Sequence, residues 1–439
     1  MFGARRRNHP IGRPASNSRS RLPNQAVALA LAAILTVGAQ AAGQTAQPAQ
    51  WVASWASAQQ TPEPQNALPA ADLADATLRQ TVPLSVGGKR LRVRLSNVFG
   101  HGPLEIDAAH VALAVAPGSP RIRPGSDRPL TFDGRPDAVI PAGAEYWSDP
   151  VDLPAPALAD LTVTIHLGRA PDGQTSHPGS RTTSWLVHGD AVAAEDLGRG
   201  AKVQHWFQLS GVDIAATGGG AVVVLGDSIT DGRGSTTDGD DRWPDQLARR
   251  LQASPQTASL GVVNVGIGGN RVLLDGLGPN ALARIHRDLF GQSGVRAVIV
   301  LEGVNDLGTL TQTAPAPPAS HTALVSQLIA AYAQIIAEGH AHGLTMIGGT
   351  ITPWAGAAVY HPDADNEADR QQVNAWIRAA GHFDAVADFD AALRDPQHPE
   401  RLLPAYDSGD HLHPSPAGYR AMAGTVPLDA LKSPPRTAR

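Results

Sequence analysis

The sequence of 439 residues contains no cysteine, and this absence excludes disulfides, thiolate metal sites and a cysteine nucleophile. Any covalent catalysis must therefore use another residue type. Positive charge is also in deficit: the formal net charge is −5, and it becomes −11 once residues 1–41, which carry six arginines and no acid, are removed. An acidic chain repels nucleic acid and anionic lipid surfaces, so we expect neither as a partner.

Long hydrophobic runs are missing as well, apart from AVALALAAILTVGAQA at residues 26–41. That run is shorter than the ~20 residues that a spanning helix needs. It follows an arginine-rich stretch and ends in small residues, which is the pattern of a secretory signal peptide. We expect residues 1–41 to be removed, with cleavage after Ala41 or Ala42, and the product to be secreted or periplasmic without a stable membrane span. A single membrane anchor is the alternative.

Residues 42–215 are interrupted about every ten residues by Gly, Pro, Asp or Asn, and short alternating runs lie between these breaks. This rhythm, without a long helical period, predicts an all-β sandwich or jelly roll. The stretch TLRQTVPLSVGGKRLRVRLSN, residues 77–97, predicts a hairpin that turns at its two glycines. Residues 169–184 are polar and rich in turn formers, so we expect a long loop there.

Residues 216–430 have a different rhythm, in which apolar strand-like runs alternate with segments of helical period. The runs are residues 221–225, 262–265, 297–301, 345–349 and 384–389, and the helical segments are residues 243–252, 280–290, 321–343 and 368–382. This alternation predicts a parallel sheet covered by helices on both faces. Functional groups of such a sheet gather at the carboxyl ends of its strands. Residues 431–439 read as a loose tail.

Polar motifs stand at those ends. GDSIT (226–230), GIGGN (266–270) and GVND (303–306) follow the first three strands, and DSGDHLHP (407–414) lies near the C-terminus. Together they offer a hydroxyl, a flexible backbone N–H, a side-chain amide and an Asp/His pair, which are the groups that acyl transfer through a serine requires. Residues 407–414 leave three readings open: Asp410 with His413, Asp407 with His411, or a metal ligated by this cluster.

The four motifs resemble, in order, the four sequence blocks of the SGNH, or GDSL, hydrolase superfamily, over residues 221–425. The resemblance implies a flavodoxin-like three-layer α/β/α domain and a serine esterase that needs no metal and no cofactor. It selects Ser228 as the nucleophile, His413 as the base and Asp410 as the residue that orients His413. The oxyanion donors that it implies are the backbone N–H groups of Ser228 and Gly269 and the side-chain amide of Asn305. Asp227 and Asp306 have structural, bracing roles in this interpretation.

Other motifs fail on inspection. A dinucleotide fingerprint would need a third glycine where Arg271 stands, and residues 361–369 lack the central glycine of a calcium loop, so that we expect an acidic helix start there. Trp243, Trp354 and Arg271 lie near the site loops in sequence and are candidates to line an acyl or sugar pocket, although most such tryptophans are core residues.

The expected substrate is a short acyl, for example acetyl, ester of a glycan or small molecule. The alternative is a lipase, lysophospholipase or arylesterase that acts on longer acyl esters. A non-catalytic glycan-binding protein is the rival class, and it predicts a missing site residue, whereas none is missing. The β region either binds glycan or packs on the catalytic domain and narrows the entrance to the active site. The sequence gives no indication of the oligomeric state.

Overall fold

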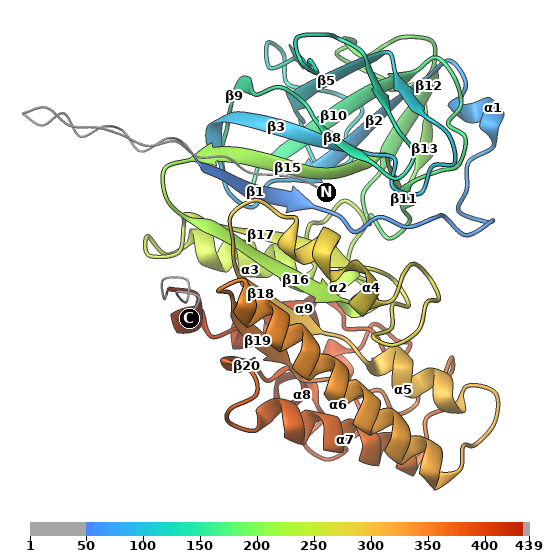
Figure 1. Cartoon of the computed structure of the whole chain (residues 1–439), viewed down its shortest axis with the longest axis vertical. Helices are drawn as coiled ribbons and strands as arrows, with labels where there is room; N and C mark the ends of the chain where they lie inside the picture. Colours follow the sequence, from blue (N-terminus) through green and yellow to red (C-terminus); the bar gives the residue numbers. More distant parts are fainter. Residues whose placement is uncertain (1–49, 433–439) are drawn as a thin grey trace, which may run out of the picture. The chain divides into compact units, whose positions relative to one another are not determined.

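The computed structural model describes residues 50–432 (Figure 1). The predicted signal peptide and all but the first two residues of the predicted tail lie outside the described residues. Between residues 50 and 432, no helix combines the length and the hydropathy needed to cross a membrane.

The first part of the described chain forms two antiparallel sheets. One has the order β1-β15-β3-β8, with β9 also paired to β3, and the other has the order β13-β12-β2-β10-β5-β6. The strand pairs β4/β7 and β11/β14 stand apart from them. The bounds are β1 Gln50–Ala56, β2 Ala76–Pro83, β3 Gly88–Ser96, β4 Leu104–Ile106, β5 Ala108–Leu113, β6 Arg128–Pro129, β7 Ala138–Ile140, β8 Glu145–Trp147, β9 Val151–Ala155, β10 Asp160–Leu167, β11 Ser176–His177, β12 Ser184–His188, β13 Ala201–Val203, β14 Trp206–Phe207 and β15 Leu209–Ala216, with the short helix α1 at Ala70–Leu73.

A common apolar core joins the two antiparallel sheets. Leu91 and Val93 of β3 belong to the same buried cluster as Leu78 of β2 and Val163 of β10, and each of these side chains has an exposed fraction of zero. Alternating strand residues bury one face of each sheet against the other, which is the arrangement of a β-sandwich. The predicted β-sandwich fold is therefore confirmed.

The prediction of a hairpin over residues 77–97 is wrong. β2 pairs with β10 and β12, whereas β3 pairs with β15, β8 and β9, so the two strands lie in opposite sheets. A Cβ on Gly87 would overlap the backbone at Ala157, so the chain uses this glycine to pass close to the segment after β9 and cross from one sheet to the other. The two glycines mark a change of sheet, and long-range pairing decides the partners of both strands.

The second part of the described chain contains a five-stranded parallel sheet of order β17-β16-β18-β19-β20, the flavodoxin-like order 2-1-3-4-5. Its strands are β16 Gly220–Gly226, β17 Leu260–Gly266, β18 Val295–Leu301, β19 Thr345–Gly349 and β20 Ala385–Ala387. The helices are α2 Ser228–Asp231, α3 Trp243–Gln252, α4 Ala281–Ile285, the π-helix η1 His286–Phe290, α5 Val304–Thr311, α6 Pro318–Ala341, α7 Ala364–Arg378, α8 Phe389–Leu393, the 3-10 helix η2 Pro404–Tyr406, α9 Pro416–Thr425 and α10 Leu428–Lys432. The predicted fold class is confirmed in both parts.

Right-handed crossovers place the helices on both faces of the parallel sheet. The step from β16 to β17 runs in one direction along the sheet and carries α3, which packs on α9. The later steps run in the other direction and carry α4, α6 and α7, so this second group covers the opposite face (Figure 1). The order of the strands reverses at β16, and this strand therefore ends at the position where such sheets bind ligands.

The edge strand β17 of the parallel sheet is covered by the sandwich. The backbone N–H of Val262 in β17 donates to Ser85 Oγ at 2.8 Å, and a Cβ on Gly261 would overlap the carbonyl oxygen of Ala53 in β1. Ala53 N in turn donates to Ser293 O at 2.9 Å. The sandwich thus satisfies an edge that would otherwise expose unpaired backbone groups. The domain boundary at residue 215/216 stays a prediction.

Candidate active site

Ser228 lies directly beyond the carboxyl end of β16, as the first residue of the four-residue helix α2. Asp227 caps this helix, since its Oδ1 accepts a hydrogen bond from Ile229 N at 2.9 Å. A Cβ on Gly226 would overlap the side chain of Thr230, so the tight exit from the strand requires glycine. These local contacts set Ser228 at the end of the sheet where the strand order reverses.

Three of the predicted site residues form one hydrogen-bonded chain. Ser228 Oγ lies 2.7 Å from His413 Nε2, and His413 Nδ1 lies 2.7 Å from Asp410 Oδ2. Ser228 and His413 are 8% and 7% exposed, so the contact between them is largely shielded from water, whereas the Asp410 side chain is 42% exposed. The backbone N–H groups of His413 and Leu412 donate to Asp410 Oδ1, at 2.9 and 3.1 Å.

The pKa of Asp410 reflects this arrangement. Partial burial alone would raise it, but the hydrogen bonds from the His413 ring and from the two backbone N–H groups hold the pKa of Asp410 well below its usual range. Asp410 is therefore an anion at neutral pH and can stabilise a positive charge on His413.

A second Asp/His pair occupies the same loop. His411 Nδ1 lies 2.6 Å from Asp407 Oδ2, and the His411 side chain is 59% exposed. No group of three or more His, Cys, Asp or Glu side chains that could hold a metal occurs among residues 50–432. Of the two histidines, the one in hydrogen-bond contact with a serine hydroxyl is His413.

The predicted oxyanion residues come from the two neighbouring strand ends. Residues 266–270, named the glycine loop here, follow β17, and Gly269 has a φ of 71°, which favours glycine. Asn305 is the second residue of α5, and its Nδ2 donates to the carbonyl of Asn270 at 2.7 Å. This bond joins Asn305 to the glycine loop beside Ser228.

Tyr360 fixes the orientation of the Asn305 amide. Its hydroxyl donates to Asn305 Oδ1 at 2.6 Å, so that the amide nitrogen faces the glycine loop. Burial, followed by the nearby charge of Asp227, raises the pKa of Tyr360 to about 12, and the hydroxyl keeps its proton at neutral pH.

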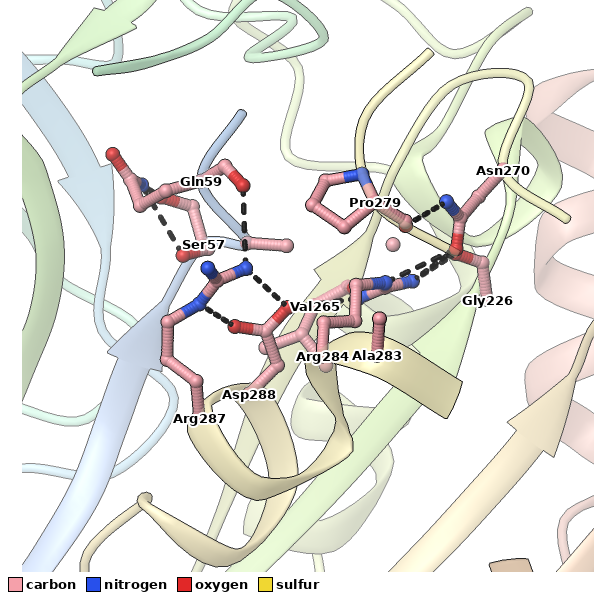
Figure 2. Close-up of polar contacts among 12 residues, drawn as sticks. Ser57, Gln59, Gly226, Val265, Asn270, Pro279, Ala283, Arg284, Arg287 and Asp288 are labelled. Atoms are coloured by element: carbon pink, nitrogen blue, oxygen red, sulfur yellow. Dashed lines mark hydrogen bonds and ion pairs between the residues drawn. The ribbon is translucent and has the colours of Figure 1, made fainter. Parts of the chain in front are cut away.

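The guanidinium of Arg284, in α4, is hydrogen-bonded to the glycine loop. It donates to Asn270 Oδ1 at 2.7 and 3.0 Å and to the carbonyls of Val265 and Gly226, at 2.6 and 3.2 Å, as Figure 2 shows. The side chain is fully buried and pairs with Asp288 at 3.0 Å. One arginine thus ties the ends of β16 and β17 to the glycine loop.

Asp306 and Asp227, for which the sequence predicts structural roles, both accept hydrogen bonds from backbone N–H groups near the site. Asp306 accepts hydrogen bonds from Val272 N at 2.8 Å and Leu273 N at 3.0 Å, and it thereby holds the chain after the glycine loop. Burial raises the pKa of Asp306 to about 6, although those two N–H groups lower it. Burial, together with the charges of Asp306 and Asp231, raises the pKa of Asp227 to about 7.

The two tryptophans proposed as pocket residues are core residues. Trp243 is completely buried and Trp354 is 1% exposed, within the core of the α/β part. Arg271 does line a cavity of about 290 Å³, together with Asp306 and Leu274. The arginine, not the tryptophans, is accessible to a small molecule.

Tyr360 and Arg284 were not among the residues selected from the sequence. Tyr360 lies 55 positions from Asn305, and no motif marks it. The sequence does contain one sign of a special role for Arg284, because it is a charged residue on the apolar side of the helical segment 280–290.

The chain is similar to known proteins over its α/β part. Residues 224–421 match the model of the GDSL-like lipase/acylhydrolase family. A search of the curated proteins finds no match to this chain. Among solved structures, an acetylxylan esterase (Axe2) from Geobacillus stearothermophilus is 21% identical, with 50% of this chain and 97% of that chain covered and a TM-score of 0.36.

Two further solved structures give similar figures. A GDSL-like lipase from Bacteroides thetaiotaomicron is 17% identical, with 48% of this chain and 88% of that chain covered and a TM-score of 0.34. LAE5, an α/β hydrolase from the metagenome of Lake Arreo, Spain, is 23% identical, with 48% and 94% covered and a TM-score of 0.33. At such identities and TM-scores these likenesses say nothing about the substrate. Residues 224–421 form a domain of the GDSL-like lipase/acylhydrolase family of SGNH hydrolases, and the protein is a carboxylic ester hydrolase.

Proposed function

We propose that the protein is a secreted or periplasmic serine esterase in which Ser228 attacks the ester carbonyl. The observation that carries the proposal is the hydrogen-bonded chain from Ser228 Oγ through His413 to Asp410, with both links at 2.7 Å. A serine hydroxyl is a weak nucleophile until a base removes its proton, and a neutral imidazole suits that task near neutral pH.

The reaction has two halves in this proposal. His413 Nε2 takes the proton of Ser228 as Oγ bonds to the carbonyl carbon, and the same proton then passes to the leaving alcohol as the acyl-enzyme forms. Water, deprotonated by His413, attacks the acyl-enzyme, and the proton returns to Ser228 as the carboxylic acid leaves. Asp410 stays ionised and stabilises the imidazolium in both halves.

Three N–H donors would stabilise the oxyanion of each tetrahedral intermediate. They are the backbone N–H groups of Ser228 and Gly269 and the second N–H of the Asn305 amide, whose first N–H is bonded to Asn270 O. Loss of one such donor typically costs ~10² to 10³ in rate.

The proposed substrate is a short acyl ester, with acetyl esters of glycans or small molecules as the first choice. Ser228 and His413 are each less than a tenth exposed, so a slender acyl group reaches them most easily. The predicted export signal supports a substrate outside the cytoplasm.

Longer acyl esters are the second candidate, and one observation favours them. Leu274, Leu277 and Val359 are 62%, 46% and 51% exposed, and they are the exposed large hydrophobic residues of the described α/β part. Leu277 lies against Gly269, and Val359 precedes Tyr360, which bonds Asn305. Exposed apolar residues beside the proposed oxyanion donors suit an acyl chain or an aryl group.

The test is hydrolysis of p-nitrophenyl acetate, butyrate and octanoate by the wild type and by Ser228→Ala. We expect activity in the wild type and a loss of roughly 10⁴-fold or more in the variant. Ser235→Ala is the matched control, because the Ser235 hydroxyl donates to the carbonyl oxygen of Gly232 in its own turn, and it should keep wild-type activity. Full activity of Ser228→Ala would refute the proposal.

The chain-length profile separates the two substrate classes. Preference for acetate, with acetate released from acetylated xylan or pectin, supports the first candidate. Preference for octanoate that disappears in the double variant Leu274→Ser, Leu277→Ser supports the second candidate and excludes the first.

A further inference from the structure

A buried hydrogen bond connects the sandwich to the proposed nucleophile turn. His177 closes β11 in the predicted loop 169–184, and Asp231 closes α2, the helix that Ser228 begins. His177 Nε2 lies 2.8 Å from Asp231 Oδ1, and the two side chains are only 3% and 5% exposed. Neither residue belongs to the hydrogen-bonded chain of Ser228, His413 and Asp410.

The hydrogen-bond partners of His177 require a proton between the two side chains. His177 Nδ1 lies 2.7 Å from the carbonyl oxygen of Ala58, which only accepts, so Nδ1 carries a hydrogen. His177 Nε2 lies 2.8 Å from Asp231 Oδ1. Without a proton between them, two hydrogen-bond acceptors would repel each other at this distance. The link between His177 and Asp231 is therefore a hydrogen bond with a shared proton, and such charge-assisted bonds are short and directional.

The Asp231 carboxyl is enclosed by glycines from two parts of the chain. A Cβ on Gly179, two residues after His177, would overlap Asp231 Oδ2, and a Cβ on Gly268 of the glycine loop would lie 3.5 Å from the same oxygen. A Cβ on Gly266 would approach the backbone nitrogen of Asp231 to 2.5 Å. Asp231 is thus in contact with the sandwich on one side and with the glycine loop on the other.

We propose that His177 is a positioning residue for ester hydrolysis, which holds the nucleophile turn against the glycine loop through Asp231. The proposal rests on the assignment of Ser228 as the nucleophile. It gives the sandwich a direct part in the reaction, because the residue that locks the geometry of Ser228 relative to Gly269 comes from outside the catalytic domain.

The nucleophile turn has other supports, so its folding does not depend on His177. Asn264 Nδ2 donates to Thr230 O at 2.7 Å, and Trp243 Nε1 donates to Thr230 Oγ1 at 3.3 Å. Without His177 the turn would persist but Asp231 would lose its fixed partner. A shift of about 1 Å between nucleophile and oxyanion donors lowers the rate by about 10²-fold.

Two substitutions of His177 separate its two hydrogen bonds. In His177→Gln the amide nitrogen reaches the position of Nε2 and can still donate to Asp231. In His177→Asn the amide nitrogen takes the position of Nδ1, so it keeps the bond to Ala58 O and is too short for Asp231. We expect kcat of His177→Asn to fall by roughly 10- to 100-fold with KM within about twofold, and His177→Gln to recover most of the loss.

A third variant disturbs the position of Asp231 and leaves His177 unchanged. Gly179→Ala places a methyl group against Asp231 Oδ2, and we expect it to lower kcat with little change in KM. Gly424→Ala is its control, because a Cβ there meets nothing within 4 Å, and it should leave both constants unchanged.

The measurements are kcat, KM and Tm for each variant, with p-nitrophenyl acetate at a temperature well below the lowest Tm. A lower Tm with unchanged kcat in His177→Asn would show a role in stability alone and overturn the proposal. If His177→Asn does not fold, unchanged kcat in Gly179→Ala overturns it instead. Ser228→Ala reports separately on the proposed function, since an inactive Ser228→Ala beside a fully active His177→Asn refutes the positioning role and leaves the esterase mechanism intact.

Discussion

Two histidines of one loop stand two positions apart, and each is bonded to an aspartate. His411 pairs with Asp407 at the surface, whereas His413 pairs with Asp410 and also reaches Ser228 Oγ. The sequence left both pairings open, and residue type and spacing do not separate them. The direction of the side chain does, because the left-handed backbone at His411, with a φ of 61°, turns this residue outward.

Substitution of these histidines tests the proposed base. We expect His413→Ala to lose roughly 10⁴-fold or more in kcat, because Ser228 loses the group that takes its proton. His411→Ala should stay within about twofold of the wild type, since its ring is 59% exposed. Steady-state kinetics on p-nitrophenyl acetate measure both, and equal losses in the two variants would contradict the assignment.

Tyr360 offers a conservative test of the oxyanion site. Tyr360→Phe removes the hydroxyl that donates to Asn305 Oδ1, so the amide is free to rotate. We expect kcat to fall by about 10- to 10²-fold with a nearly constant KM, which is less than the effect of deleting a donor. Tyr360→Phe in an Asn305→Ala background should add little further loss, because both changes act on one donor. Independent, additive losses would show that Tyr360 acts in another way.

The helix that carries Arg284 shows how an element supports the site. A single helix is predicted over residues 280–290, but the structure passes from α4 into the π-helix η1 at His286. This change of winding goes with Asp288 contacting both Arg284 and Arg287, at 3.0 and 2.7 Å, as Figure 2 shows. Arg287 also donates to the carbonyl oxygen of Gln59 at 3.4 Å, so the helix contacts the sandwich as well.

Removal of the buried arginine should affect stability and rate together. Arg284→Met leaves Asn270 Oδ1 and the strand-end carbonyls without their donor. It also breaks the buried ion pair between Arg284 and Asp288, and breaking a buried ion pair costs about 3 to 5 kcal/mol. We expect a loss of this size in urea unfolding and a lower kcat. Arg90→Met is the control, because Arg90 and Asp152 form a surface pair with exposures of 54% and 81%, and it should change neither quantity measurably. Unchanged stability of Arg284→Met would contradict the role given to this network.

Elements of the parallel sheet could be predicted closely, because continuous apolar strands between amphipathic helices carry a strong local signal. Residues 345–349 and 243–252 coincide with β19 and α3, and the acidic stretch before α7 is a helix start, capped by Asp363. The pairing of β2 and β3 could not be predicted, since their partners β10 and β15 lie far along the chain. The same limit applies to Tyr360 and His177, whose partners are 55 and 54 positions away.

At the scale of the whole molecule, the sandwich and the α/β part share titratable contacts. The carboxyl groups of Asp160, at the start of β10, and Asp240, in the loop before α3, are hydrogen-bonded to each other. Burial, followed by the charges of Asp245 and Asp160, raises the pKa of Asp240 to about 8 although Arg242 lowers it. Burial also raises the pKa of Asp160, while its contact with Asp240 and the charges of two further arginines, Arg123 and Arg249, lower it.

This pair predicts how stability depends on pH. The folded state binds the shared proton more tightly than the unfolded state, in which an aspartate has a pKa of about 3.9. The contribution of the pair is therefore fully present below about pH 4 and is lost as the pH rises towards about 8. We expect Asp240→Asn, which stays neutral, to have a flatter Tm profile and a higher Tm than the wild type at pH 8 to 9. Asp152→Asn, at an exposed position, is the control, and parallel profiles for wild type and Asp240→Asn would contradict this interpretation.

The central claim, that Ser228 is the nucleophile of a catalytic site built from three strand ends and the 407–414 loop, has one direct measurement. The full-length enzyme is inactivated with a fluorophosphonate, digested, and its peptides are analysed by mass spectrometry. We predict one phosphonyl group per chain, located on Ser228, with inactivation and labelling in equal proportion and no labelling in His413→Ala. An adduct on another residue, or full esterase activity in a chain whose Ser228 carries the phosphonyl group, would contradict the account.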